Sequence, residues 1–199
     1  MSKYFSISWI DKPVGPVAFG PENSKLNFEL TEELVGCNKL PFDLMIKKVS
    51  QLKDSVEESN DLSDLNIIWE DYLPNNIGFA LMSDRLKAIV DLHLTGQEDI
   101  DWINCKVWAN ATFKIYYILR FNRKLDVLDI ENTKYIPNSN RILKPCYSLL
   151  KVNFYNVFHE ELSDNLWQIN IFIIISEKLK KDIQKGKLTG IEFGKVTVI

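Results

Sequence analysis

The chain has 199 residues, of which 46% are hydrophobic and 12% aromatic, so it can bury a substantial core. Charged residues make up 26% and the formal net charge is -3. This balance is unlike that of disordered chains, and it lacks the strong basic excess that is typical of nucleic-acid-binding domains. No apolar run approaches the ~20 residues that a membrane-spanning helix needs, and the first residues have no secretory signal pattern.

The three cysteines, Cys37, Cys105 and Cys146, are widely spaced and odd in number. They predict neither a disulfide framework nor a cysteine zinc site. We expect three reduced, partly buried thiols in a cytoplasmic protein.

Residues 1–41 are predicted to form an irregular extension that packs on the domain, because closely spaced prolines and glycines between Pro13 and Pro21 interrupt them. Within this extension, residues 4–9 could form an edge strand and residues 27–30 a second short strand. The remaining residues, 42–199, are predicted to form one α+β domain that begins with a strand over 42–49.

The segment 54–71 carries seven acidic residues and no Lys or Arg. Its first half is predicted to be a solvated helix or loop, and residues 67–69 to return to the core. The acids could belong to a solvated connector. Alternatively, they could form a negative surface that meets a basic partner and speeds association. The candidate partner-binding residues are Asp54, Glu57, Glu58, Asp61 and Asp64.

Two segments share a pattern in which an apolar strand runs into a serine that opens a helix. They are residues 78–90 (GFALMSDRLKAIV) and 171–183 (IFIIISEKLKKDI). Ser83 and Ser176 suit the N-cap position, where a hydroxyl accepts a hydrogen bond from a free amide of the first turn. The first helix is predicted to end at Thr95-Gly96 and the second at Gly186.

Further strand candidates are spread over the rest of the chain. Together with the two helices they predict an α+β fold with a mainly antiparallel or mixed sheet and a few packed helices. These candidates are residues 100–102, 106–108, 111–121, 125–130, 149–158, 167–175 and 188–199.

No catalytic motif, metal site or cofactor site is predicted. The run His159-Glu160-Glu161 lacks the second histidine of a metalloprotease box, and residues 190–196 are one residue too short for a phosphate loop. His93 lies on the apolar face of the first helix and is predicted to be a satisfied core or boundary residue. The chain has more Trp and Tyr residues than a small core needs, and one or two of them could anchor a partner. These are Trp69, Trp102, Trp108, Tyr116, Tyr117 and Trp167.

The second strand–serine–helix unit resembles the C-terminal signature of bacterial immunity proteins from polymorphic toxin systems. The family is the one catalogued as immunity protein eleven, which is close to immunity protein forty-three. The resemblance covers residues 42–199, and Arg120-Phe121 depart from the Asn-Val step expected after the tyrosine strand. The matching pieces are residues 81–86 (LMSDRL), 116–119 (YYIL), 126–129 (DVLD), 173–179 (IIISEKL) and 188–193 (LTGIEF).

The resemblance implies a cytoplasmic protein that is encoded beside a toxin and binds it to protect the producing cell. It offers no catalytic residues to carry over, and no nucleic acid, membrane or cofactor is expected as a partner. An acidic surface would suit the basic cleft of a nuclease-like toxin. Two alternatives stay open. One is a small-molecule binder or enzyme with a helix–sheet pocket, for example with His159 beside a buried carboxylate. The other is a subunit whose aromatics form an oligomer interface.

Overall fold

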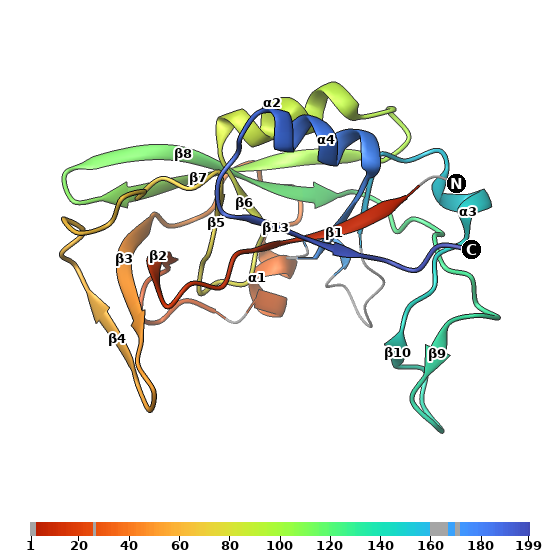
Figure 1. Cartoon of the computed structure of the whole chain (residues 1–199), viewed down its shortest axis with the longest axis horizontal. Coiled ribbons are helices and arrows are strands. Elements are labelled where there is room, and N and C mark those ends of the chain that lie inside the picture. The colour runs from red at the N-terminus through yellow and green to blue at the C-terminus, as the bar shows by residue number, and fades with distance from the viewer. Residues whose placement is uncertain (1–2, 26, 160–166, 170–171) are drawn as a thin grey trace.

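The computed structural model describes residues 3–25, 27–159, 167–169 and 172–199. The fold is α+β, as predicted, with two larger sheets, a separate two-stranded hairpin and short helices (Figure 1). Glu160 and Glu161, and residues 170–171 of the predicted strand over 167–175, lie outside the described residues. In the part of the chain that is described, no helix is long and apolar enough to cross a membrane.

The smaller sheet has four antiparallel strands in the order β11-β12-β1-β13. The prediction of an edge strand at the N-terminus is therefore wrong, because β1 lies between two C-terminal strands. Ile7 pairs with Ile173 on one side and Phe193 on the other, and its side chain is fully buried. The strands are β1 Tyr4–Trp9, β11 Val157–His159, β12 Ile173–Ser176 and β13 Ile191–Lys195.

The larger sheet has seven strands in the order β2-β3-β7-β8-β6-β5, and β4 also pairs with β3. Hydrogen bonds from Ala18 N to Pro74 O (2.8 Å) and from Asn76 N to Ala18 O (3.0 Å) connect β2 to the segment that follows β5. The sheet therefore curls towards closure. Its strands are β2 Val14–Phe19, β3 Leu44–Gln51, β4 Val56–Ser59, β5 Tyr72–Leu73, β6 Leu81–Met82, β7 Ile100–Ala109 and β8 Thr112–Phe121.

Helices α2 (Asp84–His93) and α4 (Glu177–Lys185) lie side by side (Figure 1). Ser83 and Ser176 are their N-caps, as predicted, and accept hydrogen bonds from Leu86 N (3.2 Å) and Leu179 N (3.3 Å). Between the helices, His93 Nε2 lies 2.8 Å from Asp182 Oδ2.

Four local predictions are wrong. Residues 27–30 start helix α1 (Asn27–Glu33) instead of a strand, because Leu30 packs into the core. Residues 125–130 form no strand, although Leu128 makes one bridge to Tyr147. The run 149–158 begins as helix α3 (Leu149–Val152) and only its end enters β11. The predicted helix or loop near residue 57 is strand β4. The small hairpin of β9 (Lys134–Tyr135) and β10 (Ile142–Lys144) completes the elements.

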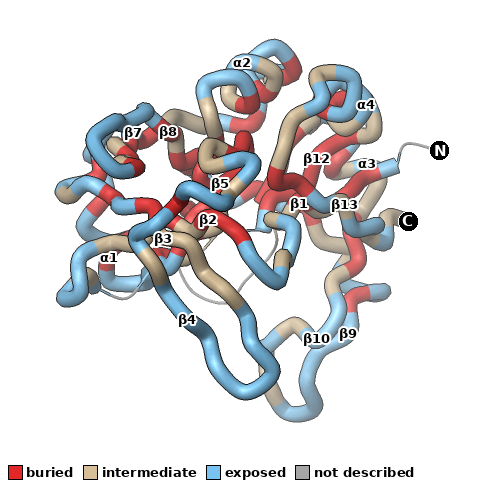
Figure 2. The backbone as a smooth tube through the Cα atoms, turned by 60° about the vertical axis from the view of Figure 1, so that its left-hand side comes forward, coloured by how far each residue is buried: buried red, intermediate tan, exposed pale blue. Residues whose placement is uncertain are grey.

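Two apolar cores lie on opposite faces of the larger sheet. The first fills the space between α2, α4, the smaller sheet and the C-terminal half of β8. It contains Ile7, Leu86 and Phe121. The second lies inside the curled sheet against α1, and contains Leu30 and Phe79. Most of the red, buried backbone in Figure 2 lies along these strands and helices.

A polar seam joins the two sheets where β5 meets the turn before β13. The buried carboxylate of Asp71 accepts hydrogen bonds from Ser83 Oγ (2.6 Å) and Thr189 N (2.9 Å). Tyr72 N donates to Thr189 O (3.1 Å). Gly190 fits here at φ +79°, and a Cβ there would lie 2.4 Å from Tyr72 O and 2.7 Å from Glu70 Oε2.

We expect Gly190→Ala to destabilise the protein by about 3 kcal/mol or more, because it combines left-handed strain with overlap at the seam. Gly96→Ala is the matched control, since Gly96 has φ +84° but no atom within 4 Å of the added Cβ. It should cost only the strain of about 1–2 kcal/mol. Urea unfolding measures both, and equal losses would contradict the role of the seam.

The division of the chain at residue 41 stays a prediction. Strands β1 and β2 from the predicted extension nevertheless belong to the two sheets, one to each.

Candidate functional site

The predicted acidic residues lie on and after a hairpin of β3 and β4 that projects from the larger sheet (Figures 1 and 2). Val56, Glu57 and Glu58 of β4 are all exposed. The exposed β4 forms because its residues pair with the end of β3, from Lys48↔Ser59 to Gln51↔Val56. The hairpin is the part of the molecule where the candidate partner-binding residues are most accessible.

Two of the five acids are neutralised within the chain. Glu58 Oε2 lies 2.7 Å from Lys47 Nζ, and Asp64 Oδ2 lies 2.9 Å from Lys48 Nζ. In the described part of the chain, no ion pair involves Asp54, Glu57 or Asp61. Ser63 donates hydrogen bonds to the carboxylate of Asp61, and these lower the pKa of Asp61. This carboxyl group therefore stays ionised at neutral pH.

The register divides the acids between two faces of the hairpin. Glu58 lies opposite Val49, and Glu57 lies opposite Ser50. Successive strand residues point to opposite faces, so Glu58 shares a face with Lys47 while Glu57 shares the other with Lys48. The five acids therefore do not form one continuous patch, a feature that only the strand register reveals.

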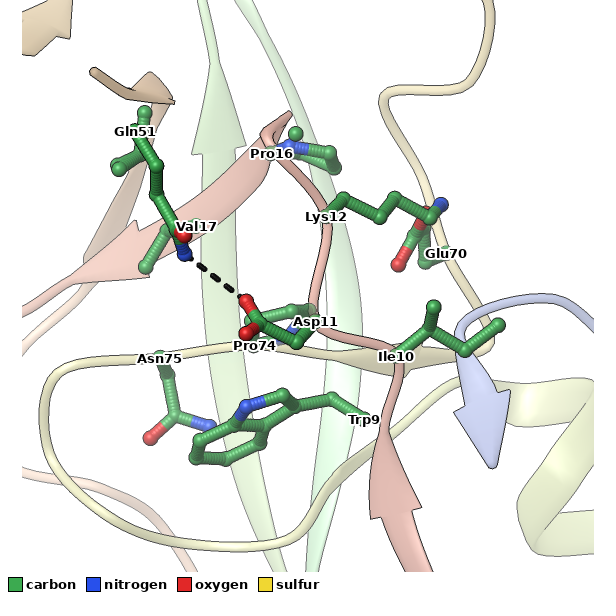
Figure 3. A pocket seen from close by; sticks show the side chains of 12 residues that line it. Trp9, Ile10, Asp11, Lys12, Pro16, Val17, Gln51, Glu70, Pro74 and Asn75 are labelled. Carbon is green, nitrogen blue, oxygen red and sulfur yellow. Dashed lines mark hydrogen bonds and ion pairs between the residues drawn. The ribbon is translucent and has the colours of Figure 1, made fainter. Parts of the chain in front are cut away.

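A cavity of about 160 Å³ lies beside the base of this hairpin, where β1 passes into β2 (Figure 3). Asp11 Oδ1 accepts a hydrogen bond from Gln51 Nε2 at 2.8 Å. Glu70 is fully buried and forms an ion pair with Lys12 through Oε1, while Oε2 is buried without a hydrogen-bond partner among the described residues. The cavity is smaller than typical ligand pockets of roughly 300–1,000 Å³, and its lining contains no His, Cys, Ser or Thr.

The two histidines have structural roles. His93 is buried, as predicted, and its Nε2 lies 2.8 Å from Asp182 Oδ2, but its Nδ1 is buried without a hydrogen-bond partner among the described residues, so it is only partly satisfied. His159 is fully buried, its Nε2 accepts a hydrogen bond from Leu125 N at 2.8 Å, and its ring packs edge-on against Phe121. His159 does not line the cavity described above, and the hypothesis of a helix–sheet pocket at His159 stays a prediction.

The cysteines differ in accessibility. Cys37 is exposed, whereas Cys105 and Cys146 are buried, and burial raises the pKa of both buried thiols. A raised pKa leaves little thiolate for nucleophilic chemistry. Among the residues that the structure describes, no group of three or more His, Cys, Asp or Glu side chains could hold a metal ion.

The aromatic residues that the sequence analysis singled out lie in different environments. Tyr116 is buried and donates from its hydroxyl to Glu70 O at 2.7 Å, and Trp69 stacks on its ring. Trp102 packs edge-on against Tyr117. Trp108 lies at the far end of β7, where its ring tilts against the half-exposed Phe113. Trp108 thus lies beside two exposed apolar neighbours, Met45 and Phe113.

The sequence matches the model of an immunity protein family, Imm11, over residues 39–198. The chain therefore belongs to the Imm11 immunity protein family, in agreement with the resemblance seen in its motifs. No curated protein matches the chain.

Lys12→Met should destabilise the protein by about 3 kcal/mol, because it leaves the buried carboxylate of Glu70 without its cation. Lys47→Met is the control, since the Lys47–Glu58 pair is exposed and should contribute less than about 1 kcal/mol. Adding Glu70→Gln to Lys12→Met should recover stability, because the uncompensated charge is removed. Thermal and urea unfolding measure the unmodified protein and the three variants, and a double variant no more stable than Lys12→Met would contradict this account.

Proposed function

We propose that this member of the Imm11 family is a non-catalytic immunity protein that binds and neutralises a cognate bacterial toxin in the cytoplasm. The family match over residues 39–198 carries the proposal. A stoichiometric inhibitor needs an accessible surface with a few strong anchors and complementary charge, and it needs no reacting groups. The toxin is expected to be encoded next to this protein, as the variable C-terminal domain of a larger secreted protein.

The β3–β4 hairpin supports an acidic contribution to this binding. Asp54, Glu57 and Asp61 have no ion pair among the described residues, so their charges remain available to a partner. Charges on a projecting element attract an oppositely charged surface before contact and so raise the association rate. The basic cleft of a nuclease-like toxin would be such a surface.

Co-expression tests the proposal directly. The toxin domain from the neighbouring gene is induced in a heterologous bacterium, alone or together with this protein. Growth should be restored when both are expressed, and an inactive variant of the toxin should co-purify with this protein at a fixed ratio. Unrestored growth together with no co-purification would overturn the proposal.

Reversing Asp54, Glu57 and Asp61 to Lys should lower the association rate with the inactive toxin by about tenfold at low salt, with less effect at high salt. The control reverses three other exposed acids, Glu22, Glu32 and Glu131, and so makes the same change in net charge. It should leave the rate within about twofold. Surface plasmon resonance at several salt concentrations measures this difference. Equal effects of the two triple variants would show that only net charge matters.

A further inference from the structure

The outer face of the larger sheet is the face turned away from the second core. Helices and the smaller sheet cover only one half of it. Helix α2 packs over the C-terminal half of β8, where Leu86 and Val90 share a core with Leu119 and Phe121. The β7–β8 hairpin continues well past this helix (Figure 1). On that uncovered half, Phe113 is 50% exposed, Met45 44% and Ile115 40%.

Four large apolar side chains form a continuous line across this uncovered half, which we call the aromatic row. The strand register pairs Phe19 with Met45, Met45 with Trp108, and Trp108 with Phe113. Residues that are paired directly across strands point to the same side of a sheet. The intervening residues Ile46 and Val107 are buried in the second core, which places the row on the opposite, outer face.

Lysine side chains lie over the rings of the row. Lys47 Nζ is 4.9 Å from the centre of the Phe19 ring, and Lys106 Nζ is 4.2 Å from that of Trp108 and 4.3 Å from that of Phe113. Such stacking holds both the cation and the ring in place, and so pre-organises the surface.

Each of these lysines already has an acidic partner in this chain. Lys47 pairs with Glu58, and Lys106 lies 3.6 Å from Asp43, which also accepts a hydrogen bond from Trp108 Nε1 at 2.8 Å. A partner therefore does not need to supply compensating charge at the centre of this surface. A nucleic acid would require free cations for its phosphates, and here the two lysines are balanced by Glu58 and Asp43.

We propose that the aromatic row is the centre of the toxin-binding surface, and that its occupant is an apolar segment of the toxin with no net charge. This inference rests on the proposed function. Specific interfaces have an apolar centre rich in Trp, Phe and Met and a polar rim, and the row has this composition. The β3–β4 hairpin continues directly from the strand that carries Met45, and Glu58 lies on the same face as Met45 and Lys47. Glu58 therefore lies at the rim of the row, whereas Glu57 points to the other face.

The test compares two double variants that each replace two exposed apolar side chains. Met45→Ser/Phe113→Ser changes the row, whereas Leu92→Ser/Leu150→Ser changes residues that are 84% and 85% exposed outside it. Binding to the inactive toxin is measured by isothermal titration calorimetry. The row variant should bind about 30-fold more weakly or worse at any salt concentration, and the control within about threefold. Trp108→Ala should weaken binding in the same way, and circular dichroism checks that each variant is folded.

The outcomes separate the two proposals. If the unmodified protein binds the toxin and the row variant binds equally well, only the aromatic row is overturned. If the unmodified protein neither binds nor protects, the proposed function fails as well. Two further results would also overturn the inference. One is a dimer, seen by light scattering, that the row variant dissociates. The other is binding of a single-stranded oligonucleotide that the row variant abolishes.

Discussion

The buried carboxylate of Asp71 is the interaction on which the arrangement of the two sheets depends. It accepts hydrogen bonds from Ser83, the N-cap of α2, and from Thr189 in the turn before β13. One side chain thus connects the larger sheet, the smaller sheet and the first of the paired helices. The carboxylate also accepts hydrogen bonds from Arg85 Nη1 and from Thr189 Oγ1, each at 3.3 Å, so both of its oxygens are engaged within the chain. The tight approach of Gly190 beside it leaves the seam little freedom to adjust.

The features that the sequence predicted correctly are those decided by neighbouring residues. Ser83 and Ser176 cap helices because the hydroxyl and the amide that it satisfies are only three residues apart. The long strand over residues 112–121 follows from its aromatic and branched composition. Residues 125–130 alternate as a strand would, yet among the described residues they pair with no strand and make only one bridge, from Leu128 to Tyr147. Alternation alone does not supply a partner.

The candidate binding surfaces show even more clearly that neighbouring residues alone do not predict which side chains come together. The acidic run was visible as composition, but its division over two faces depends on which residue of β3 lies opposite Glu57. Trp108 was one of several aromatics in excess, and nothing local distinguishes it from Tyr116, which is buried. Only the pairing of β2, β3, β7 and β8 aligns Phe19, Met45, Trp108 and Phe113. The family match in turn supplies what geometry does not, namely that a partner is to be expected at all.

The position of β1 between β12 and β13 has a consequence for how the protein is made. Residues 4–9 form their hydrogen bonds with residues 173–176 and 191–195, so the smaller sheet cannot be completed until almost the whole chain has left the ribosome. At typical synthesis rates of about 5–20 residues per second, the first strand waits on the order of ten seconds or more for its neighbours. During that time its apolar residues are exposed to chaperones and to misassembly.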